Sequence, residues 1–436
     1  MNEIFLLIEK INKIVWGAPL LIILMGTHIF FTFRLNFVQK KIGRGIRLSV
    51  STSSDLEGET SSFAALTTTL AATLGVGNII GVSTAVAFGG PGAILWCWIT
   101  GVLGMATTYA ECYFGVLYRR KTKDGSYLGG PMYTLEHALN SKILPVLLGF
   151  LILVASYGVG CSTQANSISK TASTLWGISP YLSGMVAALI TGLVIVGGVK
   201  AVASFCMKLV PAMGAFYIIA CIILLVMNRH FLLPATGLIL RSAFLPQAMA
   251  GGFIGSTIKL AARYGISRGL FSNEAGLGTA AIAAASAKTK NPHDQALISM
   301  SATFWDTVVM CGITGLVIVS NMIKNPSSID GLSPGEYTTA AFRQIPYVGE
   351  YVLGLAIIAF AVATLIGWSY FGEKAVLYLF GKDGIGAYRL CYIIMVFVGA
   401  ILSLELVWEL SDFINAFIII PNILSIIILN KKIKYD

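Results

Sequence analysis

Long apolar stretches separated by short polar segments run the whole length of the chain. A bilayer core of about 30 Å needs about 20 consecutive apolar residues in a helix, and eleven stretches meet this length. The pattern therefore predicts an all-α polytopic membrane protein. The predicted helices cover residues 15–33, 62–89, 92–118, 145–168, 179–197, 209–227, 249–287, 297–321, 349–371, 387–408 and 412–430.

Two of these stretches, 62–89 and 249–287, are unusually long and have glycines and polar residues in their middle. With the first helix set aside, ten helices remain, and the two unusual ones begin two halves of five that run in opposite directions. Glycine-interrupted helices at matching places in inverted halves indicate a transporter binding site. Glycines that only allow close helix packing are the alternative. The predicted units are an N-terminal interfacial segment with an extra helix and a basic loop (1–60), a first repeat broken near 75–78 (61–228), and a second repeat broken near 269–274 (229–436).

The composition agrees with a membrane protein. Hydrophobic residues make up 56% of the chain and charged residues 11%, whereas a soluble domain carries about 25% charged residues. This excludes disordered, nucleic-acid-binding and coiled-coil proteins. The seven cysteines and four histidines are scattered singly, which argues against a disulfide framework or a metal-binding motif.

The placement of Lys and Arg predicts the orientation. If the N-terminus is external, 20 of the 30 basic residues fall in cytoplasmic segments and seven in external ones. Positive residues concentrate on the cytoplasmic side of membrane proteins. We therefore expect an external N-terminus and a cytoplasmic tail at 431–436, in the plasma membrane of a prokaryote.

The first candidate site lies midway along the second helix, at residues 71–78. Gly75 and Gly77 weaken the helix between Thr73 and Asn78. Unwinding there would release carbonyls for a small cation and amides for a carboxylate. A bent but unbroken helix is the alternative.

The second candidate site lies at residues 268–278, in the middle of the seventh helix. Ser272, Asn273 and Glu274 form an unusual tripeptide for a membrane interior. An intramembrane Glu274 indicates function. The alternative is a structural carboxylate that caps the next half-helix or pairs with Arg268.

Further polar residues on other helices complete the candidate site. Gln164 ends the fourth helix and could bind a zwitterion or join two helices. Thr364 and Trp368 lie on the ninth; Trp368 could close the pocket or belong to an interfacial aromatic belt. Four more acids are expected to be buried or interfacial partners of Arg and Lys: Glu111, Asp306, Glu373 and Glu405.

These motifs resemble the alanine or glycine:cation symporter family, within the amino acid–polyamine–organocation superfamily. The resemblance runs from end to end and is carried by residues 12–17, 72–79, 89–98, 129–133, 271–278 and 367–374. The chain departs from the family pattern at Leu95, Cys97 and Lys259.

The resemblance implies a LeuT-type 5+5 inverted repeat with one extra N-terminal helix. It also implies sodium-coupled uptake of glycine or of alanine in either enantiomer. By analogy with the fold, one sodium ion should lie between the carbonyls of Ala71 and Leu74 and the hydroxyl of Thr364. The substrate positions of the family fall on Thr73, Gly77, Gln164, Phe271, Ser272, Asn273, Glu274 and Trp368.

Three other functions are possible for such a sequence. A proton-coupled carrier of the same fold would use Glu274 or another buried acid to bind the proton. A membrane-embedded enzyme would need paired His and Asp at membrane depth, and the sequence shows no such pair. Two broken helices around one closed site argue against a channel.

Overall fold

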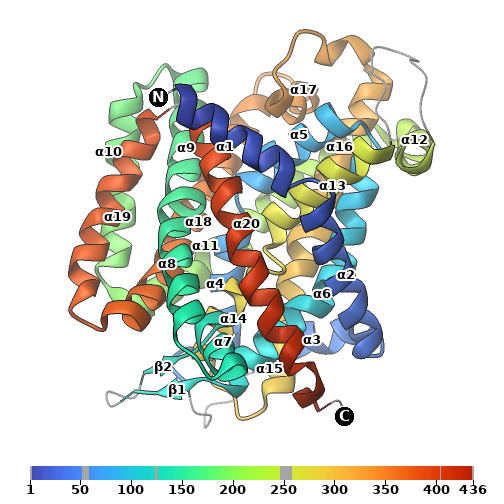
Figure 1. Cartoon of the computed structure of the whole chain (residues 1–436). Helices are drawn as coiled ribbons and strands as arrows, with labels where there is room; N and C mark the ends of the chain where they lie inside the picture. The colour runs from blue at the N-terminus through green and yellow to red at the C-terminus, as the bar shows by residue number, and fades with distance from the viewer. Residues whose placement is uncertain (1, 52–57, 123–125, 246–257, 403, 435–436) are drawn as a thin grey trace.

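The computed structural model describes residues 2–51, 58–122, 126–245, 258–402 and 404–434. Its helices stand side by side in one bundle (Figure 1). Helix α1 begins at one end of the bundle and α20 finishes at the other (Figure 1). The first and last helices therefore place the two ends of the chain at opposite ends of the bundle.

The N-terminal segment packs along the C-terminal helix. Asn12 Nδ2 donates to the Glu409 carbonyl over 2.8 Å, and Trp16 Nε1 donates to the Asp412 carbonyl over 2.9 Å. Two consecutive elements of this region are bent by 66° against each other. Its elements are α1 (Asn2–Val15), α2 (Ala18–Arg34), the 3₁₀ turn η1 (Val38–Lys41) and α3 (Ile42–Val50).

The next part of the chain corresponds to the predicted first repeat. Its first helix is broken, and its two halves are bent by 60°. The elements are α4 (Ser62–Thr73), the 3₁₀ turn η2 (Val76–Asn78), α5 (Ile80–Gly89), α6 (Ala93–Leu117), the antiparallel strands β1 (Arg120–Lys121) and β2 (Tyr127–Leu128), α7 (Pro131–Leu139), α8 (Ile143–Tyr157), the π-helical turn η3 (Gly158–Ser162), α9 (Thr163–Trp176), α10 (Pro180–Ile195) and α11 (Gly198–Met227).

The last part covers the predicted second repeat, and after the short helix α12 it has a helix in two pieces, α13 and α14. The elements are η4 (Arg229–Phe231), α12 (Leu232–Phe244), α13 (Ile258–Asn273), α14 (Thr279–Ser286), α15 (Pro292–Thr303), the π-helical turn η5 (Phe304–Cys311), α16 (Gly312–Lys324), η6 (Pro326–Ile329), η7 (Pro334–Glu336), α17 (Tyr337–Phe342), α18 (Gly349–Phe380), α19 (Gly384–Ile401), α20 (Leu404–Leu429) and η8 (Asn430–Lys432).

Each predicted helix is occupied by helical structure, but several bounds differ. Among the described residues, seven helices are long and apolar enough to cross a membrane, and two bent pairs raise the number to nine. The predicted count of eleven stays a prediction. The fourth helix runs on to Trp176, so Gln164 lies inside it rather than at its end. Part of the predicted helix 249–287 lies outside the described residues.

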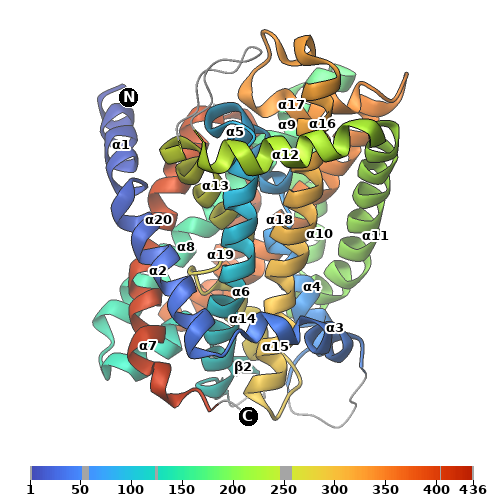
Figure 2. The same cartoon turned by 90° about the vertical axis from the view of Figure 1, so that its right-hand side faces the viewer.

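Hydropathy missed the short helices at the two ends of the bundle. Helix α12 lies across one end of the bundle (Figure 2). Helix α7 lies at the opposite end, beside the small hairpin (Figure 1). These amphipathic segments do not cross the bundle, and the length criterion for spans therefore passes over them.

The mainly apolar interior also contains many buried polar side chains, and large apolar side chains are exposed on the outside. Asn78 and Asp306 are wholly buried, whereas Leu189 and Leu193 on α10 are more than half exposed. Apolar surface on this scale is typical of a face that contacts lipid. Lys259 is exposed near the start of α13, so this departure from the family pattern leaves the core packing undisturbed.

Candidate functional site

The first break releases backbone carbonyls at residues 71–74. In a continuous helix the amide of Gly75 would bond to Ala71 and that of Asn78 to Leu74. Here the Gly75 amide donates to the Thr73 carbonyl (2.9 Å) and to Asn78 Oδ1 (3.0 Å), and the Asn78 amide donates to the Gly75 carbonyl (3.3 Å). The structure therefore interrupts the helix at these residues, and the helix is not merely bent.

Thr364 on α18 meets these carbonyls. Its Oγ1 lies 3.3 Å from the Leu74 carbonyl and 3.1 Å from the Phe360 carbonyl of its own helix. Gly367 makes this approach possible, because an added Cβ would lie 2.6 Å from the Ala72 amide nitrogen. The three residues predicted for sodium therefore lie together, and their oxygens are of the hard type that sodium prefers.

The second break lies a few residues later than predicted. Helix α13 continues to Asn273, and the irregular segment covers 274–278 rather than 269–274. Three of its residues have positive φ: Glu274 (56°), Gly276 (106°) and Gly278 (78°). Left-handed backbone is costly for a residue with a Cβ, so Glu274 keeps this conformation only because its side chain and neighbours hold it there.

The second break also releases carbonyls. The amides of Ala275, Gly276 and Leu277 would bond to the preceding turn in a continuous helix. Instead they donate to Asn273 Oδ1, Glu111 Oε1 and the Glu274 carbonyl, each over 2.9 Å. The carbonyls of Phe271, Ser272 and Asn273 therefore lack the amide donors that a continuous helix would give them.

The Glu274 carboxylate joins the second break to α18. Its Oε1 accepts from Trp368 Nε1 over 2.9 Å, and its Oε2 accepts from Thr279 Oγ1 over 2.6 Å. Thr279 is the first residue of α14, so the carboxylate contacts the start of the next half-helix through a side chain. The predicted capping is wrong, because the N-cap position of α14 is Gly278 and no side chain of a described residue accepts a hydrogen bond from the first amides of this helix. The alternative pairing with Arg268 is wrong, since that guanidinium lies 3.7 Å from the Asp412 carboxylate.

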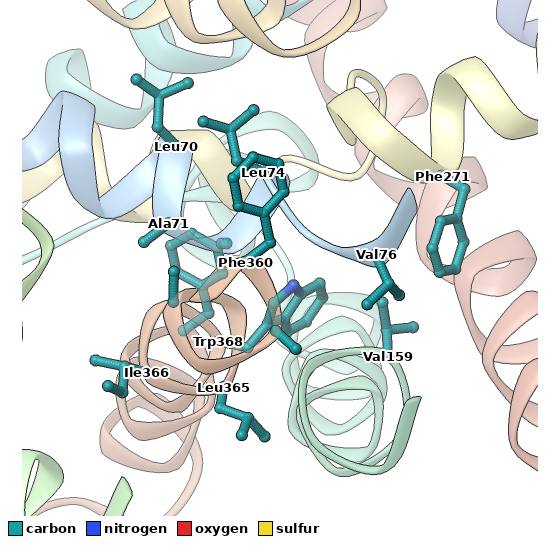
Figure 3. Close-up of a cluster of buried hydrophobic side chains, with 14 of the residues drawn as sticks. Leu70, Ala71, Leu74, Val76, Val159, Phe271, Phe360, Leu365, Ile366 and Trp368 are labelled. Carbon is teal, nitrogen blue, oxygen red and sulfur yellow. The ribbon is translucent and has the colours of Figure 1, made fainter. Parts of the chain in front are cut away.

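Trp368 is part of the buried interior. Its side chain is wholly buried, which excludes a place in an interfacial aromatic belt. It belongs to the same buried cluster as Val76, Val159 and Phe271 (Figure 3). Gly160 in the π-helical turn η3 allows the contact, because a Cβ there would lie 2.2 Å from Trp368 Cβ.

The remaining predicted substrate residues surround the two breaks. Gln164 Oε1 lies 3.4 Å from the Val76 amide nitrogen. A Cβ on Gly77 would lie 3.1 Å from the Phe271 ring. Thr73 Oγ1 and Asn273 Nδ2 are buried and make no hydrogen bond to any described residue. Buried polar atoms without a partner are costly, and a polar ligand between the breaks would satisfy them.

Asp306 links the breaks, and this role was missed from the sequence. Its side chain is wholly buried in the π-helical turn η5. Asn78 Nδ2 donates to Oδ1 over 2.8 Å, while the hydroxyls of Ser272 and Thr307 donate to Oδ2 over 2.8 and 2.6 Å. Asn78 belongs to the first break and Ser272 precedes the second, so one carboxylate holds both.

The expectation for the four other acids is corrected in part. Glu373 pairs with Arg389 at 2.8 Å, as predicted. Asp306 and Glu111 form no ion pair with Lys or Arg in the described part of the chain, so this prediction was wrong for them. The Glu405 side chain lies outside the described residues. The sequence signal that can identify such buried functional acids is an isolated Asp or Glu in an apolar stretch.

Two transporters of known structure share this fold. A Na⁺-coupled sialic acid symporter matches with a TM-score of 0.58 over 91% of this chain and 83% of that chain, at 14% identity. MhsT in complex with L-phenylalanine matches with a TM-score of 0.58 over 86% of this chain and 89% of that chain, at 18% identity. Both similarities concern the fold.

Sequence comparison is more specific. Sodium/alanine symporter AgcS of Methanococcus maripaludis is 42% identical over 97% of this chain and 94% of that protein. The probable sodium/glutamine symporter GlnT of Bacillus subtilis is 32% identical over 97% of this chain and 87% of that protein. The family model described as the sodium:alanine symporter family matches residues 1–435. The chain therefore belongs to the sodium:alanine symporter family, whose members are transporters and not enzymes.

Proposed function

We propose that the protein is a sodium-coupled symporter that imports glycine and either enantiomer of alanine. The observation that carries this proposal is the pair of broken helices, whose released carbonyls lie beside buried polar atoms without partners. Such a site can strip the water from a small zwitterion and a cation and replace their hydrogen bonds and ligands.

The sodium ion would bind at the first break. The carbonyls of Ala71 and Leu74 lose their helical amide donors, and the Thr364 hydroxyl already lies beside Leu74. A bound cation would replace the contact between Thr364 and Leu74 with oxygen–cation contacts. Sodium would in this way stabilise the broken helix before the substrate arrives.

The amino acid would bind between the breaks. Its carboxylate would accept from the amides near Gly77 and displace Gln164 from its long contact to the Val76 amide. Its ammonium group would donate to the carbonyls released at residues 271–273. Phe271 and Trp368 would limit the substrate to a small side chain, and Thr73, Ser272, Asn273 and Glu274 would complete the site.

The membrane arrangement we propose is eleven helices, with α1–α3 outside an inverted 5+5 repeat. The N-terminus would be external and the C-terminus cytoplasmic, in a prokaryotic plasma membrane. The opposite positions of the two chain ends support an odd number of crossings (Figure 1). Alternating access would move the two repeats around the fixed site between the breaks.

Uptake into proteoliposomes tests the proposal. We expect labelled alanine and glycine to accumulate under an inward sodium gradient and to equilibrate without accumulation when sodium is equal on both sides. A protonophore should not abolish accumulation driven by sodium. Accumulation driven by a proton gradient without sodium would favour a proton-coupled carrier, and alanine flux that never exceeds equilibrium would favour a channel.

Unlabelled amino acids then define the substrate. Glutamine is a necessary competitor, because a relative is described as a probable sodium/glutamine symporter. We expect alanine and glycine to compete with labelled alanine and glutamine not to compete. Strong competition by glutamine with weak competition by glycine would contradict the proposed substrate class.

A further inference from the structure

Three buried acids without a Lys or Arg ion pair surround the breaks in the described part of the chain: Glu111, Glu274 and Asp306. Their side chains are between 0% and 4% exposed. A buried ionised carboxylate is very costly unless it is paired or receives hydrogen bonds. Each acid must therefore be stabilised by donors, by a cation or by a proton.

The hydrogen bonds separate Glu111 from the other two. Both oxygens of Asp306 and both of Glu274 accept hydrogen bonds from neighbouring side chains. Glu111 Oε1 accepts twice, from the Gly276 amide over 2.9 Å and from Asn422 Nδ2 over 2.6 Å. Glu111 Oε2 is buried and accepts from no described residue. Of the six carboxylate oxygens, it is the one left free to carry a proton.

Glu111 also controls the second break directly. By taking the Gly276 amide, it keeps that amide away from the Ser272 carbonyl, which a continuous helix would use. Asn422 on α20 binds both partners, because its Nδ2 donates to Glu111 Oε1 and also lies 2.8 Å from the Gly276 carbonyl. The segment 274–278 is thereby held between α6 and α20.

The surroundings of Glu111 contain few other titratable groups. Glu274 belongs to the segment that Glu111 holds, and Cys112 is the next residue on α6. On α2, His28 is wholly buried, and its Nδ1 lies 2.7 Å from the hydroxyl of Thr107, one turn before Glu111. On α15, His293 contacts Tyr109 of α6. Helix α20 presents the neutral Asn422.

We propose that Glu111 is a proton-binding site that controls the second break of the proposed symporter. A proton from water bonds to Oε2 and leaves again as the carboxylate re-forms, with no change in oxidation state. A charged acceptor makes a hydrogen bond roughly twice as strong as a neutral one. Protonation therefore weakens the bond to the Gly276 amide and allows segment 274–278 to move, whereas the carboxylate holds it.

The proposal rests on the function proposed above and predicts how transport depends on pH. Since protonation releases the segment, uptake driven by a fixed sodium gradient should fall several-fold from about pH 6 to about pH 9. Glu111→Gln keeps an acceptor oxygen for Gly276 and imitates the neutral acid. We expect this variant to transport alanine with a nearly flat pH profile.

The control is Glu350→Gln, which removes an exposed carboxylate paired with Arg343. It should keep the pH profile of the unmodified protein. A wild-type profile in Glu111→Gln would overturn the proposal, and so would a flat profile in the unmodified protein. Failure of the proposed function is recognised separately, because the unmodified protein would then show no sodium-driven accumulation at any pH.

A second measurement needs no variant. In weakly buffered detergent solution, a pH-sensitive dye reports protons taken up or released when sodium and alanine are added to the purified protein. Starting well above neutral pH, we expect proton uptake of up to one per protein. No proton movement at any starting pH would overturn the proposal even if Glu111→Gln fails to fold.

Discussion

In both breaks, backbone amides have lost their helical acceptors, but the groups that replace those acceptors differ between the two breaks. At the first break, the freed amides turn to neutral acceptors: the Thr73 carbonyl and the amide side chains of Asn78 and Gln164. At the second break, Glu111 takes one amide, and Glu274 itself adopts a left-handed conformation. Because the amides of the first break bond to neutral acceptors, its carbonyls are available to a cation. The second break involves the carboxyl groups of Glu111 and Glu274, which can bind and release protons.

Asp306 connects these two settings, and its removal should have the largest effect. Asp306→Ala leaves donors on Asn78, Ser272 and Thr307 without their acceptor, at a cost of about 1–3 kcal/mol for each buried donor. We expect alanine uptake to be lost and the melting temperature of the purified protein to fall. Uptake at the wild-type rate would show that the breaks are positioned independently of each other.

Asp294→Ala is the matched control for this change. Asp294 lies in the first turn of α15, and its carboxylate forms a partly exposed pair with Arg44 at 3.1 Å. Such pairs contribute about 0–1 kcal/mol. This variant should transport and melt almost as the unmodified protein does.

Trp368 tests whether the second break limits the size of the substrate. Trp368→Ala removes a wholly buried ring beside Glu274, so valine and leucine should gain at least about tenfold in uptake relative to alanine. Trp368→Phe removes the indole N–H but keeps a ring, and it should still exclude leucine. Unchanged exclusion of leucine in Trp368→Ala would remove this ring from the wall of the pocket.

Gly75 tests the first break alone. A Cβ at this position would lie 2.7 Å from Thr364 Oγ1, although its φ of −127° is open to any residue. Gly75→Ala should therefore push Thr364 away and raise the sodium concentration for half-maximal uptake roughly tenfold, or about 1.4 kcal/mol. Gly81→Ala is the control, since nothing lies within 4 Å of its added Cβ. A loss of alanine affinity at saturating sodium would place the effect in the substrate site.

The sequence predicted where the chain breaks better than how each break is held. Glycines beside polar residues marked the first break correctly, because glycine weakens a helix wherever it lies. The second break was predicted several residues too early, because no local sequence pattern indicates that Glu274 adopts a left-handed conformation. The shared role of Asp306 depends on Asn78 and Ser272 meeting across about 200 residues of chain, and no spacing in the sequence reveals that meeting.

The smallest effect should come from Thr364, and it bears most directly on the role of the first break. The hydroxyl has two partners: the Phe360 carbonyl of its own helix and the Leu74 carbonyl of the break. If sodium binds there, Thr364→Ala removes one neutral ligand, which we expect to cost about 0.5–1.5 kcal/mol, or roughly 2–10-fold in sodium affinity. Alanine affinity should fall with it, because coupling between two ligands is reciprocal, and added sodium should restore it.

Thr364→Ser separates this role from local helix packing. Serine keeps the hydroxyl and loses only a methyl group, so sodium dependence should stay close to that of the unmodified protein. The measurement is equilibrium binding of labelled alanine at a series of sodium concentrations. If Thr364→Ala binds alanine with unaltered sodium dependence, the hydroxyl serves only the Phe360 carbonyl, and the first break does not hold the ion at this point.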